Sequence, residues 1–122
     1  MESRIIEIDP NCVNEFEKLK KKYKIESIFL KLNDNFNLLY VEKTLSKISQ
    51  DDFLESIPVD QPRLIIYKKY SNNKIIFIRW IPEIVQDTIE YSYSNASTAI
   101  LELLIGINEY MEVKDLIQLS NL

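Results

Sequence analysis

The sequence predicts one α/β domain, in which a sheet of apolar strands is covered by amphipathic helices. Two neighbouring apolar runs, residues 64–67 and 75–78, have the continuous hydrophobicity of strands that are buried on both faces. Downstream, apolar residues recur at the spacing of one helix face, at Ala96, Ala99, Ile100, Leu103, Leu104 and Ile107. A chain of 122 residues has room for a single domain (1–122) whose core needs neither disulfides nor metal.

The N-terminal half predicts an edge element, a helix and a hairpin. The apolar lead at residues 5–8 suits a brief edge strand or a segment tucked against the sheet. Asp9 followed by Pro10 is a helix-start signal, and we expect this helix to end near Lys22 to Lys24. Residues 25–32 then alternate like a strand, and residues 36–41 return as its partner after an Asn-Asp-Asn turn.

The C-terminal half predicts the centre of the sheet and its longest helix. Ser49, with Asp52 three residues later, opens a short helix. Residues 63–70 and 74–80 form the second hairpin, which we place at the centre of the sheet. The segment 82–95 is ambiguous, and we favour an early start of the long helix, which then runs to Gly106. Residues 110–122 cover one more edge.

Composition excludes several classes of function. The net charge of -4 disfavours nucleic-acid binding, and the basic run from Lys18 to Lys24 suits a solvated helix face better than a phosphate or lipid site. The chain has no histidine, one cysteine and one glycine, which disfavours common metal sites, thiolate clusters and phosphate-binding glycine loops. We therefore expect no enzyme activity and no cofactor. Cys12 suits a small core residue, and the absence of a signal peptide or membrane span predicts a cytoplasmic protein.

Two apolar residues of the predicted long helix, Leu101 and Ile105, point away from its buried stripe. The pair lies close to Ser97 and Thr98, and an outward apolar pair favours contact with a partner. In the alternative interpretation, the C-terminal segment of the chain covers the pair.

Several motifs, in this order, resemble those of the actin-depolymerising factor/cofilin family. The strongest is Lys74 to Glu83, which is similar to the family pattern Lys-Ile-Val-Phe-x-x-Trp-Ser-Pro-Asp. The similarity extends over about residues 4 to 120 and includes further matches at residues 21–25, 52–58, 64–67, 93–97 and 106–107. The resemblance implies a mixed sheet of about five strands between helices. It also implies a cytoskeletal protein that binds actin monomers and filaments and that depolymerises or severs the filaments.

The resemblance also implies the residues that contact actin. Monomer contacts are expected at Ser3, Arg4, Ile5, Thr88, Glu90, Tyr91, Asn95, Ser97, Leu101 and Ile105. Filament-side contacts are expected at Lys68, Lys69 and Lys74. Phosphoinositide lipids are a further possible partner, and the protein is expected to be a monomer that inserts into no membrane.

The sequence departs from the family pattern at the expected contacts. Thr88, Glu90 and Ser97 stand where the family has basic residues, and Arg4 stands at the regulatory serine, next to Ser3. The loop between the two central strands is reduced to residues 71–73, and most of the family's C-terminal helix has no counterpart before Leu122. We therefore expect filament binding and severing to be weaker than monomer binding.

Three other functions stay open at this point. The first is that of a glia-maturation-factor-like protein, which binds the branch-nucleating actin-related-protein complex. Residues 48–51 and 61–63 resemble that group, whereas Trp80 favours cofilin. The second is a small acid/base enzyme, which would need a pocket with two converging carboxylates. The third is a scaffold that has kept the fold and lost actin binding.

Overall fold

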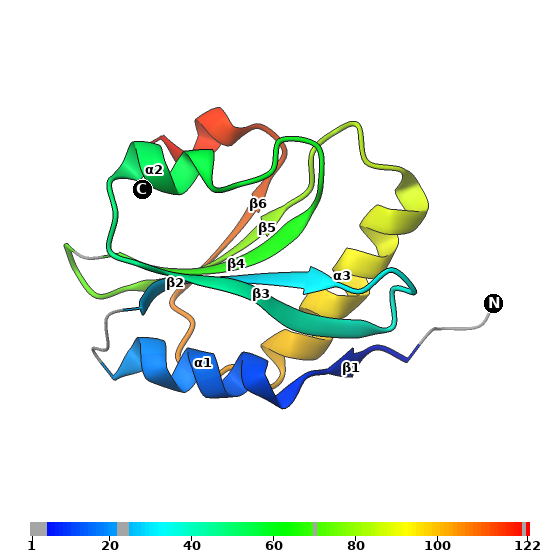
Figure 1. Ribbon diagram of the computed structural model, residues 1–122, viewed down its shortest axis with the longest axis horizontal. Helices are drawn as coiled ribbons and strands as arrows, with labels where there is room; N and C mark the ends of the chain where they lie inside the picture. The colour runs from blue at the N-terminus through cyan, green and yellow to red at the C-terminus, as the bar shows by residue number, and fades with distance from the viewer. Residues whose placement is uncertain (1–4, 22–24, 70, 121) are drawn as a thin grey trace.

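The computed structural model describes residues 5–21, 25–69, 71–120 and 122. Six strands form one sheet in the order β1-β3-β2-β4-β5-β6. Helices α1 and α3 cover one face of this sheet, and α2 and the 3-10 helix η1 cover the other (Figure 1). The predicted α/β class, with a mixed sheet between helices, is confirmed, and the sheet has one strand more than expected.

The first hairpin and its edge strand follow the predicted order. Strand β2 (Ile25–Leu32) pairs antiparallel with β3 (Leu38–Ser46), and β1 (Glu7–Ile8) adds to β3 in parallel. The apolar segment at residues 5–8 thus contains an edge strand, which is one of the two predicted alternatives. The predicted return strand begins later than expected, because Phe36 lies in the turn with a φ of 56°.

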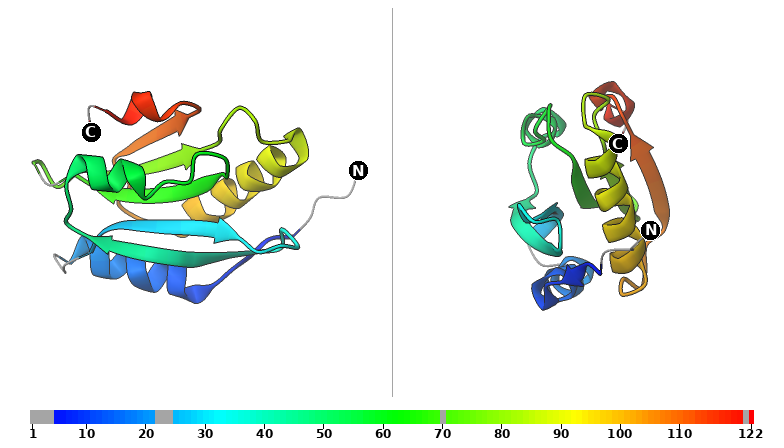
Figure 2. Two further views of the ribbon diagram at one scale, coloured as in Figure 1. Left: turned by 45° about the horizontal axis from the view of Figure 1, so that its top comes forward. Right: turned by 90° about the vertical axis from the view of Figure 1, so that its right-hand side faces the viewer.

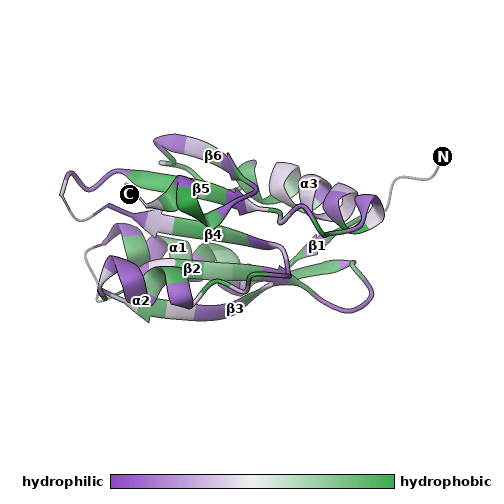
Figure 3. Cartoon of the chain, turned by 90° about the horizontal axis from the view of Figure 1, so that it is seen from above, coloured by the Kyte–Doolittle hydropathy of each residue, from purple (hydrophilic) through white to green (hydrophobic). Residues whose placement is uncertain are grey.

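The predicted central position of the second hairpin holds for β4, whereas β5 lies next to the edge strand β6. Strand β4 (Arg63–Lys68) lies between β2 and β5 (Ile75–Trp80), and both pairings are antiparallel. Figure 3 shows most of β5 and the middle of β4 in the colour of hydrophobic residues. Strand β6 (Glu109–Val113) pairs in parallel with β5, so the C-terminal segment covers the sheet edge, as predicted.

The two shorter α-helices begin at the predicted capping residues. Helix α1 (Pro10–Lys20) begins after Asp9, whose Oδ1 accepts a hydrogen bond of 2.8 Å from the backbone N–H of Asn11. The helix ends at Lys20, before the predicted end at residues 22–24, which lie outside the described part of the chain. Helix α2 (Gln50–Glu55) begins after Ser49, whose Oγ accepts from the backbone N–H of Asp52 at 3.1 Å.

The long helix starts early and ends early. Helix α3 (Asp87–Leu101) confirms the early start, but the prediction that it continues to Gly106 is wrong. After the helix the chain has to turn back to the sheet, where the backbone N–H of Asn108 donates to the carbonyl oxygen of Ile75 at 2.8 Å. Leu104 still reaches the core, whereas Leu103 is 49% exposed. The helical spacing of apolar residues therefore continues in the sequence beyond the point where the helix ends.

Each face of the sheet has its own apolar core. Helices α1 and α3 contribute Cys12, Phe16, Leu19, Tyr93, Ala96 and Ile100 to one core. Helix α2 and η1 (Leu116–Leu119) cover the other core, which contains Phe53, Trp80 and Leu119. The side chain of Gln50 links α2 to the end of η1, because its Nε2 donates hydrogen bonds to the carbonyl oxygens of Leu119 and Ser120. Strand β1 and the start of α3 lie toward the same end of the molecule (Figure 2).

Candidate functional site

The first half of α3 presents an outward face that nothing in the described chain covers. Its inner face is anchored by Tyr93, whose hydroxyl accepts a hydrogen bond of 3.0 Å from the backbone N–H of Leu32. On the outer face, Asp87 and Thr88 are exposed, and the ring of Tyr91 is 56% exposed. An aromatic side chain that remains this exposed is a feature of protein contact surfaces.

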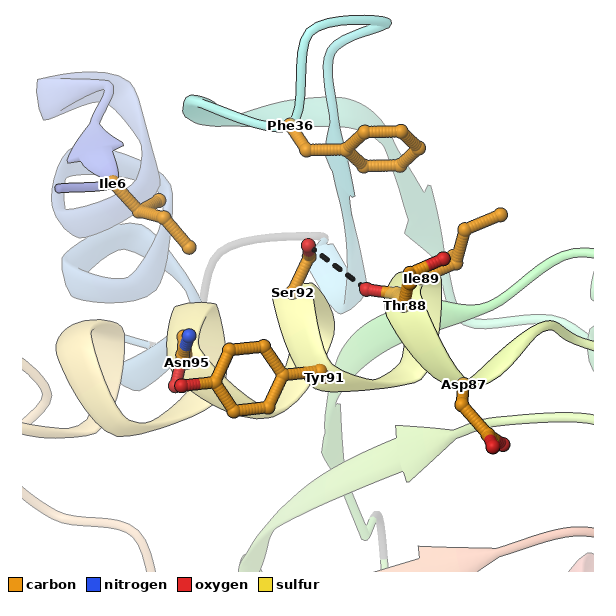
Figure 4. A pocket seen from close by; sticks show the side chains of 8 residues that line it. All are labelled: Ile6, Phe36, Asp87, Thr88, Ile89, Tyr91, Ser92 and Asn95. Carbon is orange, nitrogen blue, oxygen red and sulfur yellow. Dashed lines mark hydrogen bonds between the residues drawn. The ribbon is translucent and has the colours of Figure 1, made fainter. Parts of the chain in front are cut away.

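A hollow of about 570 Å³ lies beside this face (Figure 4). Three separate segments form it: the residue just before β1, the β2–β3 turn and the first nine residues of α3. Its lining residues are Ile6, Phe36, Asp87, Thr88, Ile89, Tyr91, Ser92 and Asn95. The hydroxyl of Ser92 donates to the carbonyl oxygen of Thr88 at 3.1 Å, so the helix itself satisfies this donor. The lining is mainly apolar, with one carboxylate.

The expected monomer contacts are only partly gathered here. Thr88, Tyr91 and Asn95 line the hollow. Ile5 is 85% exposed and directly precedes Ile6, whereas Ser3 and Arg4 lie outside the described residues. The structure thus brings one side of the predicted surface together from two distant parts of the chain.

Glu90 faces the other side of the helix. Its Oε2 lies 3.4 Å from Nζ of Lys114, which follows β6. One turn further along, Arg79 on β5 binds Glu112 at 2.9 Å and lies 3.5 Å from the hydroxyl of Ser94. These contacts tie α3 to the sheet edge, although such exposed ion pairs each contribute little stability.

The predicted outward pair at the end of the helix is corrected in part. Leu101 is half-buried, packs against the core and lines a second hollow with Tyr110 and Met111 of β6. The alternative interpretation, cover by the C-terminal segment, therefore describes Leu101. Ile105 is 80% exposed, as expected, whereas Ser97 is only 5% exposed and faces the interior. A small polar side chain reaches the interior here because the helix packs closely on the sheet.

Two of the three predicted filament-side lysines have internal partners. Nζ of Lys68 donates to the carbonyl oxygen of Leu19 at 3.1 Å, which caps the end of α1. Nζ of Lys74 lies 3.6 Å from Oε1 of Glu109. Lys69 is half-buried, and its backbone closes the hairpin turn through bonds to Lys74 and Asn73. These lysines lie at the end of the molecule where α1 also ends.

Sequence reasoning missed three residues at this face. Ile6 and Phe36 line the hollow, and Ile84, in the corner before α3, is 73% exposed. The signal for Phe36 was its place directly after an Asn-Asp-Asn turn, where an aromatic residue is unusual. The signal for Ile84 was that an apolar residue follows Pro82 and Glu83 at a position that belongs to no helical or strand periodicity.

The two hollows described above do not bring two carboxylates together, as an acid/base site would require. Each of the two hollows has a single carboxylate in its lining, Asp87 in one and Glu112 in the other. No group of three metal-ligating side chains occurs among the described residues. Burial, with a smaller contribution from Asp9, raises the pKa of the Cys12 thiol to about 12. Its position in the core, as predicted, makes it a packing residue. None of the described helices is long and apolar enough to cross a membrane.

A mixed sheet between two helical layers, with an open aromatic helix face, defines an α+β domain of the actin-depolymerising-factor type. The chain belongs to the family of cofilin/tropomyosin-type actin-binding proteins, whose model matches residues 5–121. It is 28% identical over 122 residues to cofilin of Mycosarcoma maydis. The aligned region covers 94% of this chain and 88% of the fungal protein. The family predicted from the sequence motifs is confirmed, and membership supports actin binding.

Solved structures of relatives share the fold. Cofilin of Streptomyces griseoflavus matches with a TM-score of 0.88 and 24% identity, over 94% of this chain and 90% of that protein. Glia maturation factor from Caenorhabditis elegans matches with a TM-score of 0.73 and 21% identity, over 97% and 93% of the two chains. At these identities the comparison shows the common architecture and does not separate the two functions.

Proposed function

We propose that this protein binds monomeric actin through the outward face of α3 and the adjoining N-terminal segment. The observation that carries the proposal is the exposed ring of Tyr91 beside a mainly apolar hollow, in a chain that belongs to an actin-binding family. The proposed contact residues are Ser3, Arg4, Ile5, Ile84, Thr88, Glu90, Tyr91, Asn95 and Ile105. Ser97 and Leu101 contribute indirectly, by fixing the helix on the sheet.

The character of this surface determines the kind of binding. Its exposed apolar side chains lie at both ends of α3, with Ile84 and Tyr91 at the start and Ile105 beyond the end. A helix of 15 residues spans about 22 Å, so these side chains can contact two separate parts of one partner. Because Glu90 already pairs with Lys114, we expect affinity to come mainly from apolar burial.

We further propose that the protein promotes filament turnover chiefly by handling monomers. Filament binding and severing are weaker, because Lys68 and Lys74 are engaged within the chain and the hairpin between β4 and β5 is short. The protein acts as a single-domain monomer in the cytoplasm, without enzymatic activity. Phosphoinositide headgroups are a secondary ligand, which we propose from the family resemblance alone, since Lys18 and Lys20 pair with Glu15 and Glu17.

Hydrogen–deuterium exchange with monomeric actin tests the proposed face. We expect slower exchange in residues 84–95 on addition of actin, since their backbone lies under the proposed contact. Residues 50–55 of α2, on the opposite side of the sheet, serve as the internal control. Protection of α2 and η1, with none in α3, would refute the proposed orientation.

A further inference from the structure

The turn between β2 and β3 holds a phenylalanine in an unfavourable backbone conformation. Phe36 has a φ of 56°, in the left-handed region that glycine and asparagine adopt most readily. The polar bonds of the turn do not require its side chain. Asn33 makes them, accepting at its Oδ1 from the backbone N–H groups of Asn37 at 3.0 Å and Leu38 at 3.1 Å. A glycine or asparagine at position 36 would suit the turn better.

The contacts of the Phe36 ring must therefore offset the free-energy cost of its left-handed backbone conformation. One part of the half-buried ring packs against the core between the sheet and α1 and α3. Another part lines the hollow beside α3, across from Ser92 and Ile89 (Figure 4). Asn73, the other non-glycine residue with positive φ among those described, is an asparagine in an exposed turn and has no such role.

The charge at the hollow narrows the choice of occupant. Asp87 contributes a carboxylate to the lining, is exposed and takes part in no ion pair within the described residues. No lysine or arginine from the described chain lines the hollow. An occupant that complements these features combines an apolar side chain with a neighbouring cation.

We propose that Phe36 and Asp87 form a receptor for one apolar side chain of monomeric actin that has a lysine or arginine beside it. The apolar side chain enters between Phe36, Ile6 and Ile89, while the cation approaches the carboxylate of Asp87. This inference rests on the proposed function and extends it, because it adds the β2–β3 turn to the contact face. The turn then contributes specificity from outside the helix.

Substitution of Phe36 separates a binding role from a structural one. Phe36→Asn removes the ring and places a favoured residue in the left-handed conformation. We expect a change in the thermal midpoint of less than about 4 °C and a rise of about tenfold in the Kd for monomeric actin. Asp87→Asn should raise the Kd by a smaller factor and reduce its dependence on salt. Val59→Ala, which shortens an exposed side chain in the α2–β4 loop, is the matched control.

The isoleucine methyl groups in the hollow identify its occupant directly. In the full chain labelled at isoleucine methyls, monomeric actin should shift the resonances of Ile6 and Ile89. Shifts of the same methyls with protein concentration would assign the hollow to a second copy. A shift of the Ile89 methyl caused by Arg4→Ala in the absence of actin would assign it to the chain's own N-terminus. Either of these results would overturn the inference.

Failure of this inference can be distinguished from failure of the proposed function. If Phe36→Asn binds actin as the parent protein does, the receptor is refuted while monomer binding stands. A large loss of thermal stability in Phe36→Asn, together with no actin-induced shift of the Ile6 and Ile89 methyls in the parent protein, would show that the ring serves the core alone and would refute the receptor. If the parent protein binds no actin, both proposals fail together.

Discussion

Replacement of Tyr91 by alanine tests the proposed contact face most economically. The ring is 56% exposed and its hydroxyl makes no hydrogen bond with the described residues, so the fold depends little on it. Tyr91→Ala should change the free energy of unfolding by less than about 0.5 kcal/mol. Any larger effect on actin affinity then reports the contact itself.

The expected loss of affinity follows from the exposed area. A tyrosine side chain can bury about 150–250 Å², and 56% exposure leaves ~80–140 Å² of it for a partner to cover. At ~25 cal/mol per Å² this corresponds to about 2–3.5 kcal/mol. Because the polar hydroxyl contributes less, we take about 2 kcal/mol, which is a rise in Kd of about 30-fold.

Tyr110 provides a matched control for this measurement. It is an equally large side chain, 64% exposed, but it lies on β6, away from the first turns of α3. Binding of labelled monomeric actin is measured by fluorescence anisotropy for the parent protein, Tyr91→Ala and Tyr110→Ala. Equal affinities of Tyr91→Ala and the parent protein would refute the reasoning, as would equal losses in the two variants.

Three further predictions concern the fold that supports this face. Burial alone would raise the pKa of Glu42, but the bidentate hydrogen bonds and the charge of Arg63 hold this pKa below 4.5. Glu42 therefore adds stability at neutral pH, and this stability is lost as the pH falls through the native pKa of Glu42. Urea titrations should therefore show Glu42→Gln less stable by about 2 kcal/mol at neutral pH and close to the parent protein well below pH 4.5. Ile100→Ala should cost about 3 kcal/mol, since the side chain is fully buried between α3 and the sheet, whereas a calorimetric loss below about 1 kcal/mol would contradict this packing. The Cys12 thiol should react with iodoacetamide at pH 8 only as fast as the protein unfolds, and rapid alkylation of the native protein would show that it is accessible.

Local signals in the sequence predicted most elements of the fold. Asp9 and Ser49 cap helices where expected, because a side-chain oxygen near the first N–H groups acts within a few residues. The apolar run at residues 75–78 indicated a strand covered on both faces, and all four residues are buried. Such patterns depend on neighbours in the chain, and the sequence displays them directly.

The errors arise where distant segments meet. Ser97 and Leu101 were expected on the surface, but close packing of α3 on the sheet and the parallel addition of β6 to β5 cover them. The hollow depends on three segments, so its lining by Ile6 and Phe36 could not be read from any one of them. The departure of Phe36 from ordinary turn chemistry was visible in the sequence, but its consequence required the fold.

The most direct test of the central claim compares monomer and filament binding with actin from the same organism. A monomer-binding titration and a filament co-sedimentation assay are performed on the same preparation of the parent protein. Our account predicts measurable monomer affinity together with weak pelleting and little severing. Strong pelleting with efficient severing would contradict the proposed preference for monomers. Binding to neither form would contradict the central claim and direct attention to the branch-nucleating complex.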